Sequence, residues 1–220
     1  MARMRTAVLV SGRGSNMAAL LDAAADPAFP AEIVVVLSNR PGAGALTRAE
    51  AAGVPTTVVD HRAYADRAAF EAAMQAELER NGVELVCLAG FLRVLTPWFI
   101  GHWPDRLVNI HPSLLPAYRG LHTHERALAD GVRIHGCTVH LVVPELDAGP
   151  IIAQAAVPVH GSDTPDTLAA RVLAAEHRLY PLALSWLAAG RVRHEAGGLV
   201  VDAPETSGML LSPGSLPDPG

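Results

Sequence analysis

An asparagine and a histidine stand two residues apart at the end of a short apolar run. Asn109 and His111 alternate with Ile110, and Pro112 and Pro116 stiffen the segment that follows. In an extended backbone, residues two apart point to the same side. An amide donor beside a protonatable imidazole can stabilise the oxyanion of a tetrahedral intermediate. The pattern favours an acyl-transfer site, and a structural histidine at a strand end is the alternative.

A carboxylate that could support this histidine lies in a later loop. Asp147 falls within Glu145-Leu146-Asp147-Ala148-Gly149-Pro150, a sequence that is also typical of an ordinary turn. Beside His111, the Asp147 charge would favour the imidazolium form of the ring. We therefore expect Asp147 to be the carboxylate partner of His111.

A glycine-containing loop, Gly12-Arg13-Gly14-Ser15-Asn16, joins an apolar run to a helical pattern. Glycines let the backbone approach a ligand, and a helix N-terminus offers unpaired N–H groups to an anion. This arrangement predicts a phosphate site, with a plain tight turn as the alternative. The loop does not match a dinucleotide fingerprint, because Met17 stands at the third glycine position and the second strand ends at Ser38-Asn39 without an acidic residue.

Composition excludes several chemistries. The 220 residues include seventeen arginines and no lysine, which rules out a Schiff-base lysine and a Walker lysine. The formal net charge of −5 comes without a basic stripe, so no nucleic-acid partner is expected. Cys87 and Cys137 lack a CxxC spacing and are expected to be buried thiols. The spacing of His122 and His124 does not suit a helical zinc site, so no metal is expected.

The periodicity of the chain predicts an α/β fold. Strands are expected at 6–11, 33–37, 56–59, 85–88 and 108–110, alternating with helices at 15–25, 44–52 and 66–81, which indicates a parallel sheet. Later elements are a helix at 123–130, an antiparallel or loop-linked pair of strands at 134–142 and 151–157, and a helix from 164 to about 190 that breaks or kinks at Pro181.

The predicted domain organisation is simple. We expect one domain over residues 1–202 and a disordered tail over 203–220, which is rich in proline, glycine and serine. The first residues lack an apolar signal region, and no apolar run is long enough to cross a bilayer. A cytoplasmic protein is the expectation.

Six segments together resemble the formyltransferase superfamily and, within it, the folate-dependent phosphoribosylglycinamide formyltransferases of purine synthesis. The segments are Gly12-Arg-Gly-Ser-Asn16, Leu88-Ala-Gly-Phe-Leu-Arg-Val-Leu95, Val108-Asn-Ile-His-Pro-Ser-Leu-Leu-Pro116, Gly120-Leu-His-Thr-His124, His135-Gly-Cys-Thr-Val-His140 and Leu146-Asp-Ala-Gly-Pro-Ile-Ile-Ala-Gln154. The resemblance covers about residues 5 to 200 in the expected order. It implies a Rossmann-like formyltransferase fold, with a mixed, mainly parallel sheet flanked by helices.

The resemblance also implies roles for individual residues. The catalytic positions are Asn109, His111 and Asp147. The positions that bind phosphoribosylglycinamide are Gly14, Ser15, Asn16 and Glu176. The folate-binding positions are Arg67, Leu92, Arg93, Val94, Leu95, Asn109, Val143 and Asp147. Arg67 could instead face the nucleotide, and Arg62 competes with it for this role.

The implied activity is that of a one-carbon group transferase in de novo purine biosynthesis. The formyl group of 10-formyltetrahydrofolate, a co-substrate, would pass to the amine of 5′-phosphoribosylglycinamide by direct attack, with Asn109 and His111 stabilising the oxyanion and Asp147 supporting them. The alternatives are a 10-formyltetrahydrofolate hydrolase and a catalytically silent folate- or nucleotide-binding module. The expected partners are the two small-molecule substrates, without nucleic acid or membrane, and a homodimer is left open.

Overall fold

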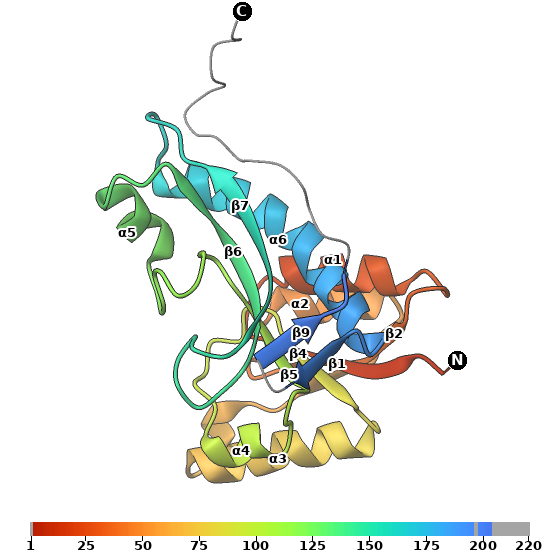
Figure 1. Ribbon diagram of the computed structural model, residues 1–220. Helices are drawn as coiled ribbons and strands as arrows, with labels where there is room; N and C mark the ends of the chain where they lie inside the picture. The colour runs from red at the N-terminus through yellow and green to blue at the C-terminus, as the bar shows by residue number, and fades with distance from the viewer. Residues whose placement is uncertain (1, 196–197, 204–220) are drawn as a thin grey trace, which may run out of the picture.

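A seven-stranded sheet with the order β3-β2-β1-β4-β5-β6-β7 forms the centre of the computed structural model, which describes residues 2–195 and 198–203 (Figure 1). Its strands are β1 (Met4–Val10), β2 (Ala31–Ser38), β3 (Thr56–Val58), β4 (Leu85–Leu88), β5 (Leu107–His111), β6 (Ile134–Leu141) and β7 (Ile151–Pro158). The helices are α1 (Ser15–Ala24), α2 (Gly44–Ala51), η1 (His61–Ala63), α3 (Arg67–Arg80), α4 (Pro97–Gly101), α5 (Thr123–Ala129) and α6 (Pro165–Ala188). The predicted mixed, mainly parallel sheet flanked by helices is confirmed.

The first five strands run parallel, and helices cover both faces of this part of the sheet (Figure 1). Alternate residues of β1 face opposite layers, because side chains alternate along a strand. Val8 and Val10 pack in the core beneath α1, α2 and α6, whereas Ala7 and Leu9 pack in the core beneath α3 and α4. Burial on both faces explains why these strands are almost wholly apolar.

Strand order reverses beside β1, and this places the loops that carry the predicted site. From β1 the chain first moves outward to β2 and β3, and then returns to β4 on the other side of β1. In open α/β sheets the loops at such a reversal diverge and leave a crevice at the carboxyl ends of the strands. The glycine loop (residues 12–16) follows β1, and a loop spanning residues 90–95 follows β4.

Strands β6 and β7 form an antiparallel pair, one of the two arrangements that their spacing predicted. β6 pairs antiparallel with both β5 and β7. The loop between β6 and β7, residues 142–150, returns to the segment that follows β5. This long β-hairpin carries the second half of the predicted site.

Of the break or kink predicted at Pro181, the break is wrong, because helix α6 runs without interruption through this residue. Thr164 caps its first turn, and Pro165 occupies a position where a missing N–H costs nothing. Buried Tyr180 and Ala183 pack on either side of the proline, which holds the helix against the sheet. Tertiary packing therefore outweighs the local helix-breaking tendency.

Both cysteines are buried, as predicted. Cys87 lies in β4 and Cys137 in β6, and each is a free thiol with no exposed surface. Burial raises the pKa of each thiol to about 12. They are packing residues and do not react as thiolates near neutral pH.

Several elements were not predicted. They are α4, η1 and a small antiparallel sheet of β8 (Val192–Glu195) and β9 (Gly198–Val201). The predicted tail falls outside the described residues from position 204 onward. None of the described helices is both long enough and apolar enough to span a membrane.

Candidate active site

Strands β5 and β6 place three polar side chains together. Asn109 and His111 lie two residues apart on β5, as predicted, and His140 lies directly opposite Asn109 on β6. His111 and His140 are almost completely buried, while Asn109 is partly exposed. The antiparallel register thus adds a second histidine to the predicted pair.

His140 fixes the orientation of the Asn109 amide. Its Nδ1–H donates to the Leu141 carbonyl at 2.9 Å, which leaves Nε2 as an acceptor 3.2 Å from Asn109 Nδ2. Burial lowers the pKa of His140 and keeps the ring neutral. The Asn109 amide therefore turns its nitrogen toward His140, and one N–H of that nitrogen remains free for a ligand.

His111 contacts two acceptors of the protein. Its Nε2 lies 2.9 Å from the carbonyl oxygen of Tyr118, so this nitrogen carries a proton and donates. Its Nδ1 lies 3.4 Å from Asp147 Oδ2. His111 is thus held between a backbone carbonyl at Nε2 and a carboxylate at Nδ1.

Asp147 is held in place by the loops on both sides. Its Oδ2 accepts from the Gly120 N–H at 2.9 Å, and its side chain is about nine-tenths buried. Asp147 adopts a left-handed backbone conformation with φ of 49°. At Gly149 a Cβ atom would lie only 1.8 Å from the Leu141 carbonyl oxygen, so the loop can close back onto β6 only with glycine there. The predicted Asp147–His111 pair is present.

The segment after β5 is anchored by two polar residues of the hairpin. Thr138 donates to the Ser113 carbonyl at 2.7 Å and accepts from the Leu115 N–H at 3.0 Å. Gln154 donates to the Leu115 carbonyl at 2.9 Å. These contacts position the loop whose Tyr118 and Gly120 backbone groups bond His111 and Asp147.

The glycine loop has the geometry of an anion site. Gly14 precedes α1 with φ of 73°, and a Cβ there would lie 2.5 Å from the Ala45 Cβ, so the loop packs closely on α2. No side chain caps the first turn of α1. The N–H groups of Ser15 and Asn16 therefore have no partner within the described part of the chain, as the phosphate prediction requires.

Glu176 lies beside this loop, also as predicted. Its Oε2 accepts from Asn16 Nδ2 at 2.7 Å, and the residue is 5% exposed. Burial raises the pKa of Glu176, while the hydrogen bond from Asn16 opposes that shift. Helices α1 and α6 thus bring together two predicted residues that are 160 positions apart.

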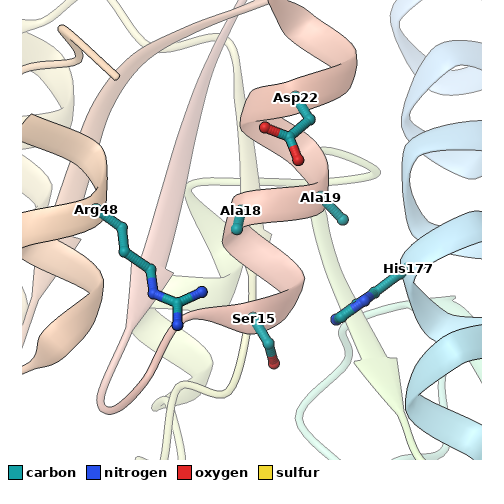
Figure 2. A pocket seen from close by; sticks show the side chains of 6 residues that line it. All are labelled: Ser15, Ala18, Ala19, Asp22, Arg48 and His177. Atoms are coloured by element: carbon teal, nitrogen blue, oxygen red, sulfur yellow. The ribbon is translucent and has the colours of Figure 1, made fainter. Parts of the chain in front are cut away.

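A groove of about 340 Å³ runs along α1 from Ser15 to Asp22. Figure 2 shows Arg48 of α2 on one flank, with its side chain extended toward the first turn of α1, and His177 of α6 on the other. Arg48 forms no ion pair among the described residues. Neither Arg48 nor His177 was predicted as a site residue, because no motif marks a side chain that reaches over from a neighbouring helix.

Most of the predicted folate-binding residues lie in loop 90–95 and the β6–β7 loop, whereas Asn109 lies in β5 and Arg67 starts α3. Leu92, Arg93 and Val94 are exposed in loop 90–95, whereas Leu95 is turned into the core beneath α3 and α4. Val143 is partly buried at the start of the β6–β7 loop.

Of the two competing arginines, Arg62 is paired with Asp60 at 2.8 Å. Arg67, at the start of α3, is exposed and unpaired within the described residues. This difference favours Arg67 as the arginine available to a ligand.

His140 is the main site residue that sequence reasoning missed. Its segment formed part of the resemblance, but no role followed from spacing, because Asn109 and His140 meet only through the β5–β6 register. An explicit antiparallel alignment of these strands could have found it.

In the described ranges 2–195 and 198–203, no group of three His, Cys, Asp or Glu side chains could hold a metal ion.

Comparison with known proteins identifies the family. The Formyl transferase family model matches residues 4–184. Phosphoribosylglycinamide formyltransferase from Escherichia coli is 45% identical over 193 residues, which cover 87% of this chain and 91% of that protein. The chain belongs to the phosphoribosylglycinamide formyltransferase family. A solved phosphoribosylglycinamide formyltransferase from Brucella melitensis is 55% identical, with a TM-score of 0.83 over 86% of this chain and 97% of that one.

Other members of this family show the same similarity. A solved glycinamide ribonucleotide transformylase 1 from Symbiobacterium toebii is 45% identical, with a TM-score of 0.87 over 90% of this chain and 94% of that one. The trifunctional purine biosynthetic protein adenosine-3 of Bos taurus is 47% identical over 198 residues, 90% of this chain. The chain spans 20% of the length of that protein.

Proposed function

We propose that this formyltransferase transfers the formyl group of 10-formyltetrahydrofolate to the amine of 5′-phosphoribosylglycinamide, in de novo purine biosynthesis. The juxtaposition of Asn109, His111 and Asp147 carries the proposal. An oriented amide donor and an imidazole paired with a carboxylate suit the oxyanion of formyl transfer. Family membership supplies the reaction class.

Two regions beside this cluster suit the two substrates. The glycine loop offers free backbone N–H groups to a phosphate, and Glu176 offers a carboxylate to ribose hydroxyls. Loop 90–95 presents the apolar side chains of Leu92 and Val94 together with Arg93. This combination fits a folate, whose flat rings can pack against apolar side chains and whose glutamate tail carries carboxylates.

In the proposed mechanism the substrate amine attacks the formyl carbon, and a carbon–nitrogen bond forms. The free N–H of Asn109 donates to the developing oxyanion, and His111 adds a second donor once its Nε2–H leaves the Tyr118 carbonyl. A water held by Asp147 carries the amine proton to the folate nitrogen as the bond between that nitrogen and the formyl carbon breaks. No covalent bond to the chain is required.

A spectrophotometric assay tests this proposal. Purified protein is mixed with 10-formyltetrahydrofolate, and the deformylated folate is followed with and without phosphoribosylglycinamide. Production that depends on the ribonucleotide supports formyl transfer. Production of deformylated folate without the ribonucleotide would indicate a hydrolase. The absence of reaction in both mixtures would indicate a catalytically silent binding module.

Three further expectations belong to the same proposal. We place the reaction in the cytoplasm and assign residues 1–202 to one domain. The partners we expect are the two substrates and, in a homodimer, a second copy of the chain, with neither nucleic acid nor membrane. Similarity to a bacterial phosphoribosylglycinamide formyltransferase supports the cytoplasmic location. Light scattering on the purified chain tests the homodimer.

A further inference from the structure

Ser11 connects two loops that approach the site from neighbouring strands. It follows β1 directly, precedes the glycine loop and is 2% exposed. Its N–H donates to the Gly90 carbonyl at 3.1 Å, and its Oγ accepts from the Leu92 N–H at 2.8 Å. One buried residue therefore holds loop 90–95 at two points.

Asn39, fully buried just after β2, decides which way the Ser11 hydroxyl points. Asn39 Oδ1 accepts from the Ser11 hydroxyl at 2.6 Å. A hydroxyl has only one proton, so its lone pairs are left to receive the Leu92 N–H. The amide nitrogen of Asn39 points away from Ser11, toward His61 Nδ1 at 3.2 Å, and the same ring nitrogen lies 2.9 Å from the Asn39 backbone carbonyl.

We propose that Ser11 and Asn39 are positioning residues that set the backbone of loop 90–95 relative to the glycine loop. The inference rests on the proposed function, because it takes loop 90–95 as the surface that receives the folate. Both residues are too buried to touch a substrate, so they act through the loop. Leu92, whose N–H is held by Ser11, has a side chain that is 61% exposed at that surface.

Removing the Ser11 hydroxyl separates this role from the chemistry. In Ser11→Ala the Leu92 N–H and Asn39 Oδ1 both lose their partner, and the loop keeps one tether of two. We expect the KM for the folate to rise by about five- to thirtyfold. The kcat should change less, because β5, β6 and the β6–β7 loop hold the catalytic residues independently of Ser11. Ser11→Thr retains the hydroxyl and should stay close to wild type.

Ser38 provides a matched control. It is fully buried at the end of β2, and its hydroxyl donates to the Arg40 carbonyl at 2.8 Å and accepts from the Arg40 N–H at 3.0 Å. Ser38→Ala thus loses one donated and one accepted hydrogen bond, as Ser11→Ala does. Its hydroxyl makes no hydrogen bond to loop 90–95, so the folate KM should not change.

The experiment combines steady-state kinetics, calorimetric titration with tetrahydrofolate and thermal unfolding of each variant. We expect Ser11→Ala to bind tetrahydrofolate at least fivefold more weakly than Ser38→Ala, while both melt at similar temperatures. Equal tetrahydrofolate affinity in the two variants would overturn the inference. Wild-type protein that neither binds tetrahydrofolate nor transfers formyl would overturn the proposed function as well, which is a different result.

Asn39→Ala keeps the inference testable if Ser11→Ala does not fold. In that variant Ser11 Oγ can still accept from Leu92, but nothing directs its proton. A rise in the folate KM of about two- to fivefold is expected, smaller than for Ser11→Ala. An unchanged KM in Asn39→Ala would contradict the role of the Ser11–Asn39 hydrogen bond.

Discussion

At the level of single residues, the position of each proton decides what the side chains of the site can do. Neutral His140 accepts one N–H of Asn109 and leaves the other free, so the amide is oriented before a ligand arrives. His111 starts with both ring nitrogens directed at groups of the protein. Asn109 is therefore the first donor available to the oxyanion. His111 can donate to the oxyanion only after its Nε2–H leaves the Tyr118 carbonyl.

Asn109→Ala tests this order. The variant removes the oriented donor without touching the hydrophobic core, so kcat should fall by about 10²- to 10³-fold with little change in stability. The control is Asn81→Ala at the C-terminal end of α3, away from the site, which should keep wild-type kcat. A kcat for Asn109→Ala within about threefold of wild type, at saturating levels of both substrates, would contradict the assigned role.

The buried histidine His135 makes the free energy of unfolding depend on pH. It is 1% exposed, its ring packs edge-on against those of Tyr118 and His124, and its Nε2 has no partner within the described residues. Burial lowers the pKa of His135 to about 4. Between the ordinary histidine pKa of about 6.5 and this value, the unfolded chain binds a proton that the folded chain does not.

Stability should therefore fall as pH drops from about 6.5 to 4, by roughly 3 kcal/mol from His135 alone. His135→Phe removes this contribution, and urea unfolding at pH 7.5, 6, 5 and 4.5 measures the slope. His160→Phe makes the same change at an exposed position and should keep the wild-type slope. Parallel slopes for wild type and His135→Phe would exclude His135 as a source of the dependence.

At the level of elements, the β6–β7 hairpin determines whether Asp147 reaches His111. The loop can turn back only because Gly149 has no side chain near the Leu141 carbonyl. Gly149→Ala should destabilise the fold by about 1–3 kcal/mol and lower kcat by about tenfold to 10²-fold, since the strain lies two residues from Asp147. Kinetics and urea unfolding measure both effects.

Gly161→Ala is the matched control for this loop. A Cβ at Gly161 would have no atom within 4 Å. The same substitution should leave both kcat and the free energy of unfolding near wild type. If Gly149→Ala behaved like Gly161→Ala, the loop would have room to relax, and its close approach to β6 would not be what positions Asp147.

Most of the elements that the sequence predicted are marked by a buried apolar run or by a long helical segment with clear ends. Most of the parallel strands are apolar runs between turn residues, and α1, α3 and α6 have ten or more residues each; the sequence predicted all of them to within a few residues. By contrast, α4 has only five residues, and neither β8 nor β9 has a fully buried residue, so no buried apolar run marks them in the sequence. Asn109 and His111 could be paired from alternation within one strand. His140 could not, because its role depends on a register between two strands.

At the level of the whole molecule, two cores share one sheet. Leu20 belongs to the core beneath α1, α2 and α6, and Met74 to the core beneath α3 and α4. Because both cores pack on the same strands, they should unfold together. Leu20→Ala and Met74→Ala should each lower the free energy of unfolding by about 2–5 kcal/mol and shift the entire transition.

Tryptophan fluorescence distinguishes one cooperative unit from two. Trp103 packs in the core beneath α3 and α4, and Trp186 packs against the opposite core. Single-tryptophan variants that keep one or the other should report the same urea midpoint. Two separated midpoints would show that the layers unfold independently, against a single domain over residues 1–202.

Because both native thiols are buried, a cysteine introduced at the surface can be labelled selectively. With their pKa near 12 and no exposed surface, Cys87 and Cys137 would not compete with an introduced surface cysteine for a maleimide reagent. Leu146, 58% exposed beside Asp147, is one position for a fluorophore. A dye there would follow the β6–β7 loop in real time as each substrate is added, without first replacing either native cysteine.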